Sequence, residues 1–314
     1  MSTTPTSTLT ASPLPTVAAT PITLPSTAQL SAPSGTVVSA FVADSRLFRS
    51  TDRGDAWQER SAALPSGPNR EIAFVSDTGG WLATYSSAGT QCDVQTVGIT
   101  HTADAGATWD PMVSAAVAPA AEPPGTGGPR CKERLATVDA QRGFLSANGT
   151  NTTPVIYRTA DAGRTWRASN LLPVPPGFTV TPTGAFLRAD RVRAFGTTAL
   201  VLVRPSDLSA SYVYRSIDSG ATWTYLTKVP AGEGALAFVT ATRWLQIGTP
   251  SSSMETTDAG ATWHAFRTDY SQAAPIAPDV VFGDALVGYA TVRGAIQRTT
   301  DGGAHWTTIK TPGT

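Results

Sequence analysis

Six copies of one short motif run through this chain and constrain its fold more than any other feature. Each copy reads Ser or Thr, any residue, Asp, any residue, Gly, two further residues and Trp. The copies occupy residues 50–57, 102–109, 159–166, 216–223, 256–263 and 299–306. Six of the eight tryptophans stand at the last position of the motif, so chance does not explain the repetition. The aspartates lie 40 to 57 residues apart, and periods of this length are typical of propellers and solenoids.

The residue types of the motif explain why it forms a turn. An aspartate carboxylate accepts hydrogen bonds from backbone N–H groups a few residues later and closes the turn. Glycine two positions on adopts positive φ without steric cost. Tryptophan then opens the next strand with a large apolar ring to bury. The predicted structural residues are Asp52, Gly54, Trp57, Asp104, Gly106, Trp109, Asp161, Gly163, Trp166, Asp218, Gly220, Trp223, Asp258, Gly260, Trp263, Asp301, Gly303 and Trp306.

Short β-rich runs on both sides of each motif complete a repeating unit. A second, weaker repeat, with an apolar residue, a turn residue, Gly and an aromatic residue, precedes the motif at 74–81, 137–144 and 282–289. Each unit therefore predicts four antiparallel strands, which is a propeller blade. The predicted fold class is all-β, a β-propeller of four-stranded antiparallel blades. Six motifs favour six blades, but a seventh, degenerate blade is left open because the first unit lacks an innermost strand.

The two ends of the chain differ sharply in composition. Residues 1–35 are almost entirely Ser, Thr, Pro and Ala, which predicts a disordered linker, and residues 36–314 form the propeller. The linker has neither a basic start nor an apolar stretch, so it is not a signal peptide. We interpret it as a tether to a membrane anchor upstream of Met1, which would place the protein outside the cytoplasm. The alternative is a cytoplasmic protein with an unstructured tail.

Cysteine and charge usage exclude several classes of site. Cys92 and Cys131 form no CxxC pair, and they are either two free thiols or one disulfide. Strand counting places both on the same face in adjacent blades, which favours the disulfide. The three histidines take different positions relative to their tryptophans, so no metal site and no cofactor is expected. A formal net charge of zero, without a Lys/Arg run, gives no reason to expect nucleic acid as a partner.

Motif by motif, the chain resembles the BNR/Asp-box superfamily of β-propellers over residues 36–310. That superfamily includes sialidases, sortilin-type receptors and the photosystem II stability/assembly factor-like group. The paired signature, a turn followed by Gly-aromatic and then the box, is most similar to the assembly-factor group. That resemblance implies a non-enzymatic extracytoplasmic scaffold. It also implies that the six box aspartates are structural.

The sialidase alternative can be tested against the sequence. The family pattern requires an Arg-Ile-Pro motif, three arginines for the substrate carboxylate, a Tyr/Glu pair and an Asp acid/base. No Arg-Ile-Pro occurs, and no glutamate has an evident tyrosine partner. Glu71 and Glu133 could meet in space as a carboxylate pair for glycosidic chemistry. A glycan-binding or glycoside-hydrolysing propeller therefore remains the alternative to a binding scaffold.

Loop lengths predict which face of the propeller binds. The motif turns and the weaker turns fall on one face, whereas the long, varied segments fall on the other, including 86–94, 115–130, 173–183 and 268–278. Function usually resides on varied loops held by a rigid scaffold. We expect a monomer that binds a protein partner on this long-loop face, with a glycan as the alternative partner and without identifiable catalytic residues. The binding candidates are Arg70, Glu71, Arg134, Arg188, Glu233 and Tyr270.

Overall fold

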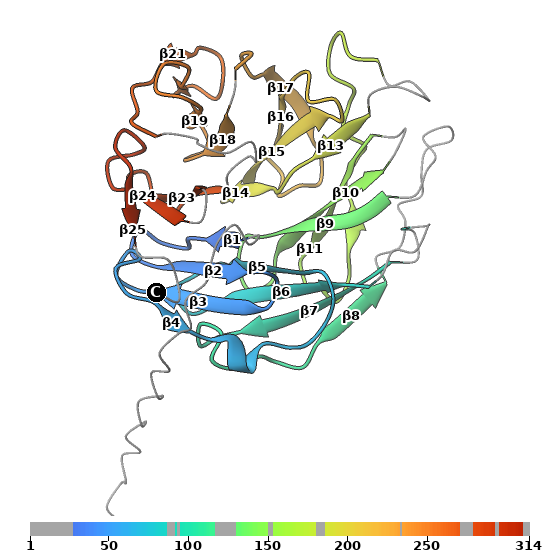
Figure 1. The fold of residues 1–314 in the computed structure, drawn as a ribbon. Helices are drawn as coiled ribbons and strands as arrows, with labels where there is room; N and C mark the ends of the chain where they lie inside the picture. The colour runs from blue at the N-terminus through green and yellow to red at the C-terminus, as the bar shows by residue number, and fades with distance from the viewer. Residues whose placement is uncertain are drawn as a thin grey trace, which may run out of the picture.

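The computed structural model describes residues 28–86, 92, 95–116, 130–149, 153–179, 186–232, 234–270, 279–292 and 295–309. In this part of the chain, strands form six antiparallel sheets, and one short 3-10 helix, η1 (Ser61–Ala63), follows the first sheet. The sheets succeed one another around a ring, from blue to red in Figure 1, and the first lies beside the last. The predicted all-β propeller is confirmed, with six blades.

Each blade is one continuous stretch of chain. Blade 1 contains β1 (Ala28–Ser31), β2 (Val38–Val42), β3 (Arg46–Ser50) and β4 (Gln58–Glu59). Blade 2 contains β5 (Arg70–Phe74), β6 (Gly80–Tyr85), β7 (Thr96–Thr102) and β8 (Val113–Ala116). Blade 3 contains β9 (Arg130–Thr137), β10 (Gly143–Gly149), β11 (Val155–Thr159) and β12 (Arg167–Ala168).

Blades 4 to 6 follow in the same order. Blade 4 contains β13 (Leu187–Ala189), β14 (Arg193–Phe195), β15 (Thr198–Pro205), β16 (Tyr212–Ser216) and β17 (Thr224–Lys228). Blade 5 contains β18 (Ala235–Phe238), β19 (Trp244–Ile247), β20 (Met254–Thr256) and β21 (His264–Ala265). Blade 6 contains β22 (Val280–Phe282), β23 (Gly288–Val292), β24 (Ala295–Thr299) and β25 (Thr307–Ile309). β13 and β14 both pair with β15, so blade 4 has an inner strand broken into two pieces.

The same hydrogen bonds close the box turn in all six blades. The Ser or Thr hydroxyl donates to the aspartate Oδ1 at 2.7–2.9 Å. The same Oδ1 accepts the backbone N–H four residues later at 2.8–3.0 Å. The glycine N–H donates to the hydroxyl at 2.7–3.0 Å. The box aspartates therefore have a structural role in closing the turn.

Each box glycine also touches the preceding blade. A Cβ added to Gly163 of blade 3 would lie 2.8 Å from Ile99 of blade 2. The glycines of the other boxes face the preceding blade in the same way, and Gly54 of blade 1 faces Ile309 of blade 6. The contact between the last and first blades is thus the same kind of contact as the other five. This repetition closes the ring at six blades and leaves no place for a seventh in the described residues.

The predicted boundary between linker and propeller is corrected by β1. This strand lies within residues 1–35, yet it pairs with β2 along its whole length, from Ala28 with Val42 to Ser31 with Ser39. Leu30 is 1% exposed, and its N–H donates to Asp279 Oδ2 of blade 6 at 2.8 Å. The expectation that the first unit lacks an inner strand was wrong, because short Ser- and Ala-rich strands carry little hydrophobic signal. The predicted disorder of residues 1–27 lies outside the described residues.

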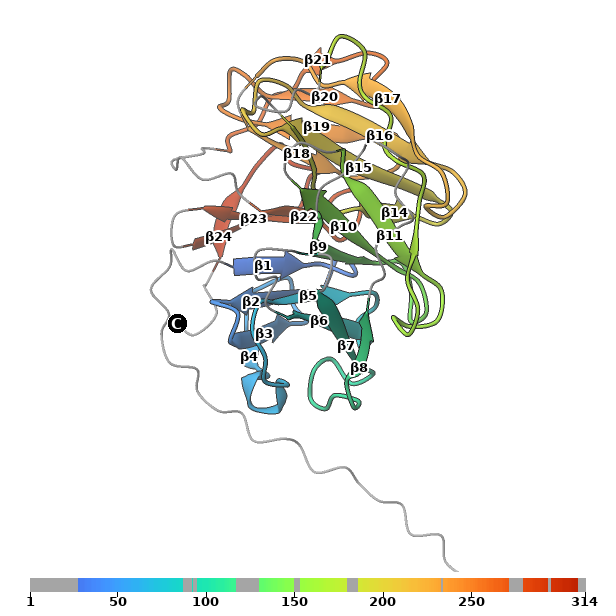
Figure 2. The same cartoon turned by 90° about the vertical axis from the view of Figure 1, so that its right-hand side faces the viewer.

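Strand order defines two faces of the ring. Turns from a blade's first to second strand and from its third to fourth strand lie on one side, here called the box face. Second-to-third connections and blade-to-blade connections lie on the other, the long-loop face. Figure 2 shows the same blades turned by 90°. In the described part of the chain, no helix is long and apolar enough to cross a membrane.

Candidate functional site

Two adjacent blades gather charged side chains from β9, from β13 and the residue after it, and from the end of β15. The blade 3–4 patch, as we name it, comprises Glu133, Arg134, Arg188, Asp190 and Arg204. Arg188 Nη2 pairs with Glu133 Oε1 at 2.8 Å, and Arg204 Nη2 pairs with Asp190 Oδ2 at 3.0 Å. Arg134 Nε lies 3.9 Å from Asp190 Oδ1. Three guanidinium groups thus share two carboxylates, which leaves the patch with a positive formal charge.

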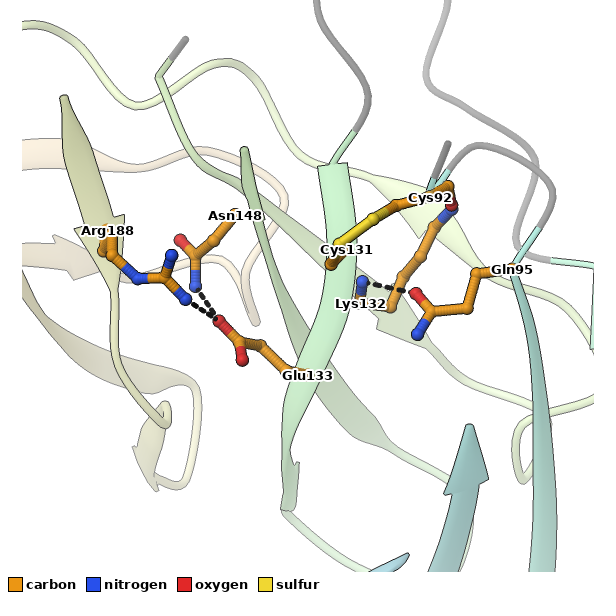
Figure 3. The surroundings of a disulfide bond; sticks show 7 residues. All are labelled: Cys92, Gln95, Cys131, Lys132, Glu133, Asn148 and Arg188. Atoms are coloured by element: carbon orange, nitrogen blue, oxygen red, sulfur yellow. Dashed lines mark hydrogen bonds and ion pairs between the residues drawn. A yellow bond between two sulfur atoms is a disulfide. The ribbon is translucent and has the colours of Figure 1, made fainter. Parts of the chain in front are cut away.

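The arginines of this patch remain accessible although they are paired. The side chains of Arg134 and Arg188 are 50% and 49% exposed, and that of Arg204 is 32% exposed. Glu133 also accepts a hydrogen bond from Asn148 Nδ2 at 2.7 Å, as Figure 3 shows. Asn148 in turn bridges to the backbone of Ala189 in blade 4. The patch therefore rests on a rigid contact between two blades and presents its cations to solvent.

Backbone irregularities explain why these side chains converge. Pairing of β9 with β10 shifts between Ala136 opposite Phe144 and Glu133 opposite Ser146, which is a β-bulge. Arg134 sits in this bulge with φ of 62°, a conformation that costs a non-glycine residue free energy and is concentrated at functional sites. In blade 4, the break between β13 and β14 leaves Asp190 and Arg191 without register partners, although the Asp190 N–H still donates to the Leu202 carbonyl of β15 at 2.8 Å. Bulges redirect side chains in this way.

A second group of charges lies nearer the axis of the ring. The axial cluster comprises Glu71 of blade 2, Arg191 and Arg193 of blade 4, and Asp279 before blade 6. Arg193 Nη2 reaches the backbone carbonyl of Phe282 at 3.1 Å, so blade 4 contacts blade 6 without passing through blade 5. The broken inner strand of blade 4 therefore ties non-adjacent blades together.

The buried charges of the axial cluster stabilise one another through charge–charge attraction. Burial disfavours the charged form of Arg191, but the carboxylates of Glu71, Asp279 and Asp190 outweigh it and raise the pKa of Arg191. Burial raises the pKa of Asp279 above its ordinary value, against the opposing pull of Arg191 and of the Leu30 N–H. The Nε of Arg191 has no hydrogen-bond partner among the described residues.

Glu71 has a tyrosine partner that inspection of the sequence missed. Tyr85 Oη donates to Glu71 Oε2 at 2.8 Å, and the N–H of Leu135 in blade 3 donates to the same oxygen. The register of β5 against β6 pairs Glu71 with Ala83, which brings Tyr85 within reach across the hairpin. Tyr85 is 4% exposed, and its burial, reinforced by Glu71, raises its pKa well above the usual range. Glu71 and Glu133 hold separate partners and form no contact pair among the described interactions.

Arg70, another predicted binding residue, makes its contacts within the fold. Arg70 Nη1 donates to the Pro65 carbonyl at 2.6 Å, and Nη2 donates to the Asp44 carbonyl. Its guanidinium lies 5.6 Å from the Phe41 ring centroid. Arg70 thus secures the connection between blades 1 and 2 on the long-loop face.

The prediction that Tyr270 is a surface binding residue was wrong. Tyr270 is 0% exposed and packs edge-on against Trp306, with ring centroids 5.3 Å apart. Burial raises its pKa to about 12. The ring fills the interface of blades 5 and 6, since loop position alone does not reveal which way a side chain points. Glu233, the remaining candidate, lies outside the described residues.

A disulfide anchors the edge of this region. Cys92 precedes β7 in blade 2, Cys131 lies in β9 of blade 3, and the structure joins them with Cα atoms 4.7 Å apart. Next to the bond, Lys132 Nζ donates to the Cys92 carbonyl at 2.8 Å, and the Lys132 N–H donates to Gln95 Oε1 at 2.7 Å. Figure 3 shows this cross-link near the Glu133–Arg188 pair, with Cys131 and Glu133 on the same inner strand, β9.

Sequence patterns did not reveal several residues of the site. Their positions depend on the bulge in β9, the break in blade 4 and the pairing of β5 with β6, which no local pattern signals. Only Arg204 could have been proposed from the sequence, because it directly follows the apolar run 199–203 and begins the loop segment 204–210. The missed residues are Tyr85, Asp190, Arg191, Arg193, Arg204 and Asp279.

Comparisons with known proteins support the fold. No protein-family model and no curated protein matches the chain. An α-L-arabinanase from Penicillium chrysogenum, complexed with arabinobiose, aligns with a TM-score of 0.55 at 14% identity over 90% of this chain and 95% of that one. The Hadza microbial sialidase Hz136 aligns with a TM-score of 0.54 at 15% identity over 90% of this chain, which spans just under two thirds (65%) of the sialidase.

YCF48 bound to D1 peptide is also among the similar structures, with a TM-score of 0.48 at 16% identity over 91% of this chain and 82% of that chain. The arabinanase and the sialidase, with TM-scores above 0.5, share the propeller fold with this chain, and at 14–15% identity the likeness concerns the fold alone.

Proposed function

We propose that this chain is a non-enzymatic binding scaffold that holds a protein partner on its long-loop face through the blade 3–4 patch. The observation that carries the proposal is the gathering of three accessible arginines beside the bulge in β9 and the break in the inner strand of blade 4. Irregular backbone within a regular repeat is costly and indicates a role that the repeat itself does not require. Arginine is also enriched where proteins bind one another, because its planar group pairs with carboxylates on a partner.

The surroundings of the carboxylates support binding over catalysis. Glu133 holds Arg188 and Asn148, and Asp190 holds Arg204. Glu71 accepts from Tyr85 and from a backbone N–H of the next blade. A general acid and base must reach the proton that they transfer. These carboxylates are instead committed to contacts that position the blades.

An extracytoplasmic location and a monomeric state belong to the same proposal. The disulfide between Cys92 and Cys131 supports the location, since such bonds persist mainly in oxidising compartments. Among the described residues, the exposed large apolar side chains are dispersed, which supports a monomer because a stable interface between copies needs a contiguous patch. These residues are Met112, Val174, Leu208, Ile217 and Leu286.

A capture experiment with charge-reversed variants tests the scaffold. The wild-type propeller, the double variant Arg134→Glu and Arg188→Glu, and a control Arg215→Glu are immobilised and exposed to envelope extract from the source cells. Arg215 is an exposed arginine that lies in blade 4, as Arg188 does, but near the box face. We expect a protein that the wild type and the control retain and the double variant loses. Retention of the same proteins by all three would contradict the proposal.

A glycoside-hydrolysing propeller is the second candidate, and the Tyr85–Glu71 pair favours it. Tyrosine hydrogen-bonded to glutamate, near Arg191, has the composition of the nucleophile pair that the sialidase pattern requires. The raised pKa of Tyr85 opposes this reading, because a phenol that retains its proton is a poor nucleophile. Fluorogenic sialosides and α-L-arabinofuranosides distinguish the candidates. We expect no hydrolysis above buffer, whereas hydrolysis abolished by Glu71→Gln would establish the enzyme.

A further inference from the structure

The disulfide and the blade 3–4 patch meet on one inner strand. Cys131 is the second residue of β9, and Glu133 of the patch lies two residues further along it. Figure 3 shows Cys92 of blade 2 on one side of this strand and Arg188 of blade 4 on the other. The bond therefore ties to blade 2 the end of the strand from which the patch begins.

Asn148 carries this connection across the blade. In the ladder between β9 and β10, Asn148 pairs directly with Cys131. Its Nδ2 donates to Glu133 Oε1 at 2.7 Å and to the Ala189 carbonyl at 2.9 Å. The same Glu133 oxygen accepts Arg188 Nη2 at 2.8 Å. A change at the start of β9 thus reaches an exposed arginine of the patch through two hydrogen bonds.

The two cysteines differ in exposure. Cys92 is 7% exposed and counts as buried, whereas Cys131 is partly exposed. In thiol–disulfide exchange, the attacked sulfur joins the incoming thiol and the other sulfur leaves as a thiolate. Access from solvent therefore favours attack at Cys131 and departure of Cys92.

A buried lysine stands beside the cysteine that departs. Lys132 is 2% exposed, and its Nζ donates to the Cys92 carbonyl at 2.8 Å. Lysine is seldom buried to this degree. A neighbouring cation stabilises a thiolate, and a thiol that forms its thiolate more readily is the better leaving group. Lys132 is thus placed to assist the opening of the bond.

The surroundings also allow the bond to close again. The Lys132 N–H donates to Gln95 Oε1 at 2.7 Å, and Gln95 directly precedes β7 of blade 2. This contact involves neither sulfur atom, so it persists when the S–S bond is broken. It keeps the start of β9 near blade 2 and the two thiols within reach of each other.

We propose that the Cys92–Cys131 disulfide is a reversible switch through which a dithiol reductant controls the blade 3–4 patch. The proposal rests on the scaffold function above and adds its regulation. A thiolate of the reductant attacks Cys131 Sγ, the S–S bond breaks, and Cys92 leaves as a thiolate. The second thiol of the reductant then attacks the mixed disulfide and releases Cys131. Two electrons and two protons pass to the cysteines, and the reductant departs as its own disulfide.

Opening the bond changes the order of the patch. Strand ends with few tertiary contacts open more readily than the middle of a sheet. Once β9 is released from blade 2, Asn148 loses its fixed position, and Glu133 no longer holds Arg188 in one place. Redox switches act in this way, by a local change of bonding that biases a larger element. The oxidised protein is the form that binds.

Exchange with a monothiol tests the assignment of the two sulfur atoms. The full chain is treated briefly with glutathione, quenched with iodoacetamide and digested for mass spectrometry. We expect glutathione on Cys131 and a carbamidomethyl group on Cys92. Glutathione mainly on Cys92 would overturn the proposed exchange.

Reduction rates test the part played by the buried lysine. Lys132→Met should slow reduction by dithiothreitol severalfold at neutral pH, because the departing thiolate loses its neighbouring cation. Lys228→Met, which removes an exposed lysine of blade 4, is the matched control and should react at the wild-type rate. Equal rates for all three proteins would overturn the role of Lys132.

Nuclear magnetic resonance of the ¹⁵N-labelled wild type tests the coupling to the patch. The Asn148 carboxamide and the Arg188 Nε–H report on the patch, and the Gly220 and Thr222 amides report on the box turn of blade 4. We expect reduction to shift or broaden the first pair and spare the second, and reoxidation to restore the spectrum. Unchanged patch signals would overturn the switch. Loss of both pairs would overturn it too, because the bond would then hold the whole fold.

The capture experiment separates the switch from the scaffold. Oxidised wild type, wild type reduced and alkylated with iodoacetamide, and the double variant Arg134→Glu and Arg188→Glu are immobilised side by side. A protein that only the oxidised wild type retains supports the switch. Equal retention by both wild-type forms, with loss by the double variant, would reject the switch and leave the scaffold standing. Retention by all three would reject the scaffold.

Discussion

Two consecutive residues of left-handed backbone shape every box turn. In blade 3 these are Ala162 and Gly163, with φ of 59° and 81°. The first position tolerates alanine, arginine or serine in other blades, but the second is always glycine. The reason is contact as well as conformation, because the glycine lies against the preceding blade. A side chain at this position would have to displace its neighbour.

Gly163→Ala should therefore destabilise the protein more than backbone strain alone would. Left-handed alanine costs roughly 1–2 kcal/mol, and overpacking against Ile99 adds about 1–3 kcal/mol. Gly196→Ala is the matched control, since Gly196 has φ of 68° and an added Cβ would meet nothing within 4 Å. Urea unfolding of both variants measures the difference. Equal losses would mean that the contact between blades contributes nothing.

Acid should weaken the box turns within a defined pH window. The N–H of Thr222 and the hydroxyl of Thr262 are the main causes that lower the pKa of Asp218 and Asp258, respectively, from 3.8 to about 2. A carboxylate with a lowered folded pKa contributes stability that is complete above about pH 4 and is lost as pH falls toward 2. Thermal unfolding from pH 6 to 2 should show Tm falling mainly below pH 4. Asp258→Asn should lower Tm at pH 6 and make the acid-dependent fall shallower. An unchanged slope would argue against this aspartate as a source of the acid sensitivity.

Blades 3 and 4 depart from the common plan at their inner strands, and these departures create the candidate site. The box, its glycine and its tryptophan could be predicted because they are local, repeated turn chemistry. Arg134 and Arg188 were predicted from position on the long-loop face, and the structure places both in the blade 3–4 patch. Asp190 and Arg191 could not be predicted, because a break in one strand leaves no periodic signal. Tyr270 was misplaced because an aromatic residue on a loop can pack inward as readily as outward.

The disulfide should stabilise the contact between blades 2 and 3. Cys92 and Cys131 are separated by 39 residues, and in the chain-entropy account a closed loop of this length is worth roughly 4 kcal/mol. The double variant Cys92→Ala and Cys131→Ala should therefore lose a comparable amount in denaturant unfolding. Unfolding of the wild type with and without reductant provides the control. A reductant-insensitive wild type would show that the bond contributes little in solution.

The whole ring closes by side chains, without a strand shared between its ends. Leu30, Phe48, Tyr289 and Ile309 belong to one hydrophobic cluster that spans blades 1 and 6. At the box face, Arg298 Nη1 donates to the Arg53 carbonyl at 2.7 Å and to Asp55 at 2.8 Å. This seam depends on β1, whose residues reach both neighbouring blades.

Deletions at the two candidate boundaries should differ strongly in stability. Removal of residues 1–35 also removes β1, its buried Leu30, and the bonds from Gln29 and Ser31 to blade 2. We expect Tm to fall by more than about 10 °C, because several kcal/mol of burial and pairing are lost. Removal of residues 1–27 should leave Tm unchanged. Differential scanning calorimetry of both truncations measures this, and similar Tm values would place the boundary at residue 36 after all.

Closure without a shared strand makes the point at which the chain enters the ring arbitrary. A circular permutant that starts at Arg70 and ends with β4 would keep every backbone pairing of all six sheets. In genetic terms, each blade is a self-contained cassette. A stretch of DNA encoding one blade can be duplicated, lost or exchanged without disrupting the strand pairing within the others.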